Sequence, residues 1–62
     1  MKYRIGSIIE YKTFTGELRR VRVTEKVAKI KNGFDGFDGI VVGDPDQTVW
    51  GYDDQITRVV VR

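Results

Sequence analysis

The chain contains neither cysteine nor histidine among its 62 residues. Without cysteine it can form no disulfide framework and no thiolate metal site, so apolar packing or a partner subunit must hold the fold, and we expect a cytoplasmic location. Ser/His and Cys/His nucleophile arrangements are excluded, and the usual general base near neutral pH is missing. The sequence therefore predicts a protein that is not an enzyme and has no catalytic residues and no cofactor.

Long apolar runs are also missing. The longest are three residues, at positions 40–42 and 59–61, whereas about 20 are needed to cross a bilayer. No apolar stretch of the signal-peptide type follows Met1. We therefore expect a soluble protein that is not secreted and has no membrane partner, and a chain this short predicts one domain, residues 1–62.

Short runs of β-branched and aromatic residues, separated by Gly and Asp, fill the chain, and no long window keeps a helical apolar period. This pattern predicts an all-β fold. We expect five strands, at residues 8–14, 17–24, 40–42, 48–52 and 56–61, with a turn of 3₁₀ helix at residues 53–55 before the last strand. In the second strand, the alternation directs Val21 and Val23 to the core and Arg20 and Arg22 to solvent.

Two segments depart from simple alternation. Val27, Ala28 and Ile30 cannot share one face of an unbroken strand, so a bulge or a single helical turn is expected near residues 25–26. A turn is expected at residues 43–46, where the sequence reads Gly-Asp-Pro-Asp. The apolar run at residues 40–42 fits a strand buried on both sides.

Three glycines recur at every third position between residues 33 and 39, and predict a loop with several positive φ angles. Phe34 and Phe37 fall within it. Such aromatics more often pin a loop to the core than stack on a ligand, and both roles remain open.

Five short strands with a 3₁₀ break before the last one match a small closed barrel, which has no exposed sheet edges. The opening Gly-Ser-Ile-Ile-Glu-Tyr, residues 6–11, resembles that of SH3-like small barrels, including the KOW and Tudor-type domains. Residues 30–33, 36–39 and 50–56 resemble segments of small proteins from actinobacterial phages and prophages. The resemblance implies an SH3-like barrel and an accessory role in a phage, but it brings no known activity. The aromatic patterns of polyproline-binding SH3 domains are absent.

Charge divides the chain into two halves. Residues 1–31 hold nine Lys or Arg against three Glu, and residues 32–62 hold two Arg against six Asp, although the net charge is only +2. If the first two strands pair, the cations would share one side of the barrel and could bind nucleic acid by displacing counterions from phosphate. A solvated strand face that prevents aggregation is the alternative. The candidate nucleic-acid-binding residues are Arg19, Arg20, Arg22, Lys26, Lys29 and Lys31.

The acidic half suggests a protein partner instead. Opposite charged poles suit docking on a charged host protein or self-association into a homo-oligomer. Trp50 and Tyr52 are candidate anchors together with Asp53 and Asp54, although a lone Trp in a small barrel more often belongs to the core.

The Asp residues fall in predicted turns, where Asp is favoured for local hydrogen bonds, and this is a more frequent role than acid/base chemistry. The Asp44-x-Asp46-x-Thr48 spacing lacks the bidentate Glu and central Gly of a calcium loop. No metal site is predicted.

Overall fold

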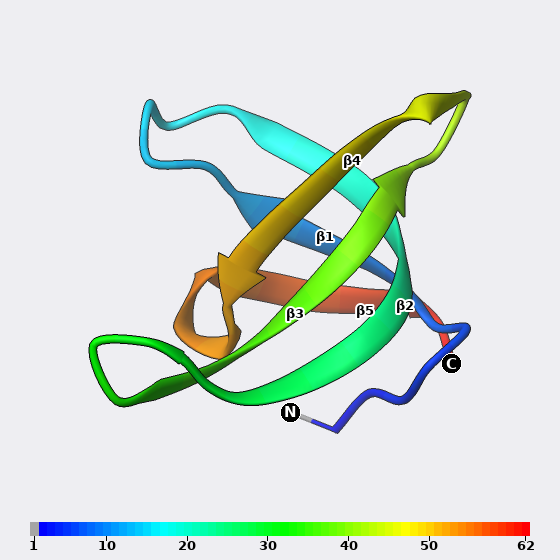
Figure 1. Ribbon diagram of the computed structural model, residues 1–62. Helices are drawn as coiled ribbons and strands as arrows, with labels where there is room; N and C mark the ends of the chain where they lie inside the picture. The colour runs from blue at the N-terminus through cyan, green and yellow to red at the C-terminus, as the bar shows by residue number, and fades with distance from the viewer. Residues whose placement is uncertain (1) are drawn as a thin grey trace.

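The computed structural model describes residues 2–62, the side chains of residues 30 and 31 excepted, and it is all-β. The elements are β1 (Ile8–Lys12), β2 (Leu18–Lys31), β3 (Phe34–Val41), β4 (Asp44–Tyr52), the 3₁₀ turn η1 (Asp53–Gln55) and β5 (Ile56–Val61). All neighbouring strands are antiparallel in one sheet of order β4-β3-β2-β1-β5 (Figure 1). The predicted number of strands and the 3₁₀ turn before the last one are confirmed, but β2 ends later and β3 begins earlier than predicted.

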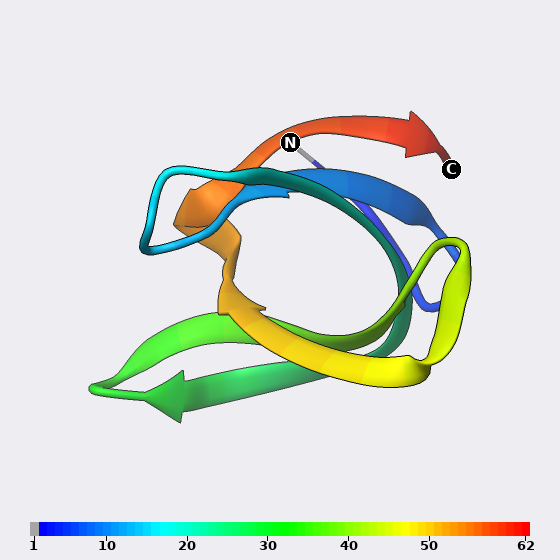
Figure 2. The same cartoon turned by 90° about the horizontal axis from the view of Figure 1, so that it is seen from above.

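The sheet is strongly curled but open. β4 and β5 meet at η1 and then run apart, as seen from above in Figure 2. Over the part of the chain that the structure describes, they are the two edges of the sheet and form no ladder with each other. The prediction of a closed barrel is therefore wrong, because η1 brings together only one end of each edge strand.

β2 belongs to both halves of the sheet. It pairs with β1 from Leu18 to Arg22 and with β3 from Val21 onward. Its register against β3 shifts between Val23 and Glu25, which confirms the irregularity expected near residues 25–26 and shows that it is a bulge. Because a bulge bends its strand and increases the local twist, β2 can pass from one half of the curled sheet to the other.

The core centres on Phe37 of β3, which is completely buried. Tyr3 and Tyr11 approach its ring edge-on, with centroid distances of 6.3 and 5.3 Å. Val21 and Val23 are buried as the alternation predicted, and Ile9 completes the cluster. Phe37 therefore packs in the core, which is one of the two roles that the sequence left open for Phe34 and Phe37.

The glycine-rich segment is not the predicted loop. Only Asn32 and Gly33 form a turn, with φ angles of 54° and 79°, and β3 begins directly after them. Gly39 lies within β3, where a Cβ atom would come 2.1 Å from Cγ1 of Val21. Glycine is needed there because two strands pack closely, and not because the chain turns.

The far end of the β3–β4 hairpin also differs from its prediction. Residues 40 and 41 end β3 only half-buried, and the turn consists of Val42 and Gly43. The strand buried on both sides and the turn at residues 43–46 are therefore wrong. Residues 44–48 are all exposed, so this end of the hairpin extends beyond the core, where no second layer covers it.

Candidate binding surface

Trp50 and Tyr52 point away from the core of the sheet. Gly51 between them faces inward, because a Cβ atom there would lie 2.8 Å from Cζ of Phe37. Side chains alternate along a strand, so those of Trp50 and Tyr52 lie on the opposite side of β4, where both are half-buried. The alternative that Trp50 belongs to the core is therefore wrong.

Two further aromatic rings join them. Phe14 of the β1–β2 loop lies 6.1 Å from Trp50 and 6.1 Å from Tyr52 between ring centroids. Tyr52 lies 5.4 Å from Trp50 and 5.9 Å from Phe34 at the start of β3. Phe14 is 72% exposed and Phe34 56% exposed. We call these four residues the aromatic surface.

Hydrogen bonds hold the segments that carry these rings. The side chain of Gln55 accepts a bond from the backbone N–H of Tyr52 at 2.8 Å and donates one to the carbonyl of Lys12 at 2.9 Å. It thereby links the end of β4 to the start of the loop that carries Phe14. The amide of Asn32 donates to the Tyr52 hydroxyl at 3.2 Å. The rings are thus arranged before any partner arrives, which lowers the entropic cost of binding.

Two acidic side chains lie beside Trp50. Asp38 is its cross-strand partner on β3, and Glu25 of β2 is the next residue across the sheet. A hollow of ≈ 400 Å³ adjoins Trp50, and both carboxylates line it. Asp54, which follows in η1, is exposed. The environment of the aromatic surface is therefore negative.

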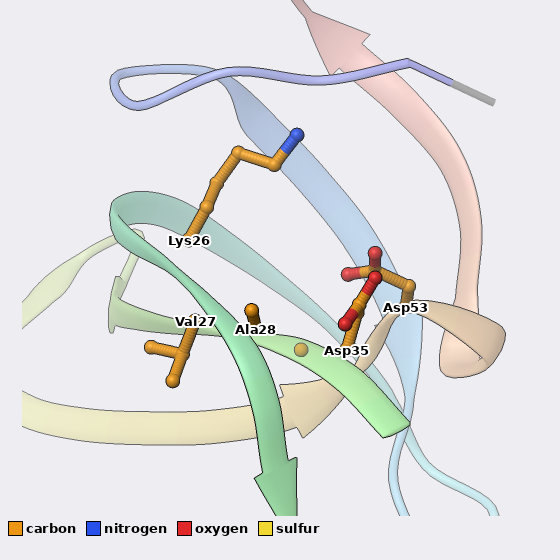
Figure 3. A pocket seen from close by; sticks show the side chains of 6 residues that line it. Lys26, Val27, Ala28, Asp35 and Asp53 are labelled. Atoms are coloured by element: carbon orange, nitrogen blue, oxygen red, sulfur yellow. The ribbon is translucent and has the colours of Figure 1, made fainter. Parts of the chain in front are cut away.

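Asp53, a predicted partner-binding residue, instead contacts Tyr3 in the N-terminal segment of the protein itself. It accepts a hydrogen bond from the hydroxyl of Tyr3 and lines a hollow of ≈ 220 Å³ with Asp35 and Lys26 (Figure 3). Burial, followed by the hydrogen bond to Asp53, raises the pKa of Tyr3 above its ordinary value. Asp53 therefore anchors the N-terminal segment to η1.

Lys26 also holds the N-terminal segment in place. Its ammonium donates to the carbonyl oxygen of Tyr3 at 3.1 Å and lies 4.5 Å from the centre of the Tyr3 ring. In Figure 3 its side chain extends toward the N-terminal segment. This cation is therefore engaged within the protein.

The other predicted basic residues are not all brought together. Arg20 and Arg22 are exposed on the outer side of β2, whereas Arg19 alternates with them, is half-buried and lies 3.9 Å from Glu17. Lys29 is exposed beyond the bulge, and the side chain of Lys31 lies outside the described residues. The predicted single basic side is wrong, because alternation and the bulge separate its members.

A different set of cations does share a face. Ile9 and Tyr11 of β1 are buried, so Glu10 and Lys12 point outward. Glu10 is the cross-strand partner of both Arg20 and Arg58, whose Nε atoms lie 3.5 and 3.3 Å from its carboxylate. Desolvation raises the pKa of Glu10, but the hydrogen bonds and charges of Arg58 and Arg20 outweigh it, and its pKa is lowered. We call Lys12, Arg20, Arg22 and Arg58, with Glu10 among them, the cationic face.

Sequence reasoning missed Arg58 because it belongs to the acidic half of the chain. It could have been found only from the pairing of β5 with β1, which the sequence alone does not give. Phe34 was missed as a neighbour of Tyr52 because the first part of β3, which pairs with the end of β4, was predicted to be a loop.

Neither surface is a metal centre. Within residues 2–62, side chains of 30 and 31 excepted, no three His, Cys, Asp or Glu residues are grouped to hold a metal ion. No helix in the same part of the chain is long and apolar enough to cross a membrane. No protein-family model, curated protein or solved structure matches the chain.

Proposed function

We propose that this protein is a non-enzymatic binding module that contacts a protein partner through the aromatic surface. The observation that carries this proposal is the unbroken series of ring contacts from Phe14 through Trp50 and Tyr52 to Phe34. Single exposed apolar residues are common on small proteins and need no explanation. Contiguous exposed apolar groups with a polar rim are typical of interaction sites, and Trp and Tyr are frequent anchors in them.

The charges around the rings favour a basic partner segment. Glu25 and Asp38 lie beside Trp50, and a Lys or Arg side chain in the adjoining hollow would meet both carboxylates and an aromatic ring. The same carboxylates would repel phosphate groups, so nucleic acid is disfavoured at this surface. The partner could be a host protein or a second copy of this chain, whose Lys and Arg side chains have the required charge.

We extend the proposal to the type of module. Five antiparallel strands with a 3₁₀ turn before the last one support an SH3-like small barrel, here with its two edge strands unpaired. The resemblance of residues 30–33, 36–39 and 50–56 to phage proteins supports an accessory role in a phage or prophage. The absence of cysteine supports action in the cytoplasm.

A peptide selection tests the proposal. A random peptide library would be selected on the immobilised protein, and the affinities of the recovered peptides measured by the fluorescence of Trp50, the only Trp in the chain. We expect peptides that combine Lys or Arg with apolar residues. Phe14→Ala should weaken their binding by at least about tenfold, because it removes an exposed ring that contacts both Trp50 and Tyr52.

Leu18→Ala is the matched control. Leu18 is also a large exposed apolar residue, at 59% exposure, but it belongs to the outer side of β2 and not to the aromatic surface. Its replacement should leave peptide affinity within about twofold. Equal losses in the two variants, or peptides without basic residues, would contradict the proposal.

A further inference from the structure

The cationic face lies on the other half of the sheet and shares only Arg20 and Arg22 with the set that the sequence grouped together. Across the strands, Arg20, Glu10 and Arg58 form one row, and Arg22, Ile8 and Val61 form the next. Lys12 lies beyond the first row on β1. Four cations and one carboxylate give this face a charge of +3, because Glu10 neutralises one of the two arginines that share it.

We propose that the cationic face is a second binding site, independent of the aromatic surface, and that it holds the phosphate backbone of a nucleic-acid duplex. Lysine and arginine displace counterions condensed on phosphates, and this supplies the affinity of sequence-independent binding. Ile8 and Lys12 are four residues apart on β1, or ~13 Å, a length over which one strand of a duplex presents about four phosphates.

The composition of the face favours a duplex over a single strand. Its outward residues on β1, β2 and β5 include aliphatic neighbours such as Ile8, Leu18 and Val61, but no aromatic ring among the positions that the structure describes. Single-strand binders stack bases on aromatic side chains. A face without such rings contacts only the backbone, so its binding does not depend on base sequence.

More cations adjoin the second row. Arg62 follows Val61 and, with Lys2 and Arg4, lines a hollow of ≈ 370 Å³ that has no acidic residue among its lining side chains. Val61 pairs with Ile8, which in turn pairs with Arg22, so the hollow lies at the same end of the sheet. The cationic face therefore continues toward the N-terminal segment and does not end at Arg22.

Salt-dependent titration tests this site. Binding of a labelled random-sequence DNA duplex would be followed by fluorescence anisotropy between 50 and 200 mM salt, beside the matching single strand. With three phosphate contacts, the logarithm of the affinity should fall with a slope of about −2.7 against the logarithm of salt, or ~40-fold over this range. The duplex should bind at least as tightly as the single strand.

Two charge reversals of equal size locate the site. Arg22→Glu should weaken duplex binding severalfold or more and reduce the salt slope by about 1. Lys29→Glu changes the net charge equally at an exposed position outside the face, and it should have a much smaller effect. Both side chains are exposed, and neither forms an ion pair with a residue that the structure describes. The fold should therefore persist in both variants, which a circular dichroism spectrum would verify.

Three results would overturn the assignment. If Arg22→Glu and Lys29→Glu weakened duplex binding equally, the affinity would depend on the net charge of the protein alone, and the cationic face would not be a binding site. No binding at 50 mM salt would leave the face as a solvated surface. Single-strand binding that Phe14→Ala removes would place nucleic acid on the aromatic surface instead.

Discussion

The two outer surfaces of this protein differ although one curled sheet forms both. Around β3 and β4 lies the aromatic surface with acidic neighbours, whereas β1, β5 and the first part of β2 carry the four cations of the cationic face among aliphatic residues. β2 passes through both halves, and its bulge after Val23 lies between Arg22 on one surface and Glu25 on the other. The division therefore follows strand pairing and alternation, and it only partly follows the basic and acidic halves of the sequence.

Arg58 and Lys26 show that the charge of a surface does not follow the basic and acidic halves of the sequence. Arg58 comes from the acidic half of the chain and joins the cationic face through its pairing with Glu10. Lys26 comes from the basic half but anchors Tyr3. A net charge computed over a sequence segment is therefore a poor guide to the charge of a surface when strands distant in sequence pair.

Loss of the common core should abolish both surfaces at once. Phe37→Ala removes the ring on which Tyr3 and Tyr11 pack, and should lower the free energy of unfolding by about 3–5 kcal/mol. A domain of this size has only a few kcal/mol of stability, so the variant should be largely unfolded. Thermal unfolding followed by circular dichroism would measure this.

Phe34→Ala provides the comparison for this variant. It removes the same side chain from a position that is 56% exposed, so it should change the free energy of unfolding by no more than about 0.5 kcal/mol. If both variants unfold at the same temperature, Phe37 is not the centre of the core.

The sequence predicted the elements of the fold better than their arrangement. Alternation identified Val21 and Val23 as core residues, and the interruption at residues 53–55 identified the 3₁₀ turn, because these features depend on neighbouring residues. Gly39 was assigned to a loop because its actual constraint, the side chain of Val21, belongs to another strand. Trp50 and Tyr52 were identified individually, but their contacts with Phe14 and Phe34 depend on tertiary structure.

The hydrogen bond from Tyr3 to Asp53 holds the N-terminal segment against the half of the sheet that carries the aromatic surface. Tyr3→Phe removes the hydroxyl that donates to Asp53, and should lower the free energy of unfolding near pH 7 by about 1 kcal/mol. It should also loosen η1, which follows Tyr52, and weaken peptide binding. Duplex binding should weaken only slightly, because Tyr3 also lines the hollow beside Lys2, Arg4 and Arg62. Urea unfolding and the two titrations would measure these effects.

The pH dependence of this variant has a definite sign. The pKa of Tyr3 is raised in the folded state, so its contribution to stability is complete below the unfolded pKa, near 10. That contribution is lost as the pH rises from there through the folded value, because the unfolded state then releases the proton more readily. The stability difference between the wild type and Tyr3→Phe should therefore shrink above about pH 10. A difference that grows with pH would show that the phenol is not held neutral by Asp53 and burial.

The smallest expected effect concerns the one carboxylate on the cationic face. Glu10→Gln keeps the shape of the side chain but releases Arg20 and Arg58 from their shared ion pair, and raises the charge of the face from +3 to +4. Duplex binding should become tighter and its salt slope steeper by up to about 1, whereas peptide binding at the aromatic surface should not change. The stability of the wild type should fall at acid pH, as the pH drops through the lowered pKa of Glu10, and the variant should lack this part of the decline. If the variant binds duplex more weakly, Glu10 positions the two arginines for phosphate, and the geometry of the pair matters more than its charge.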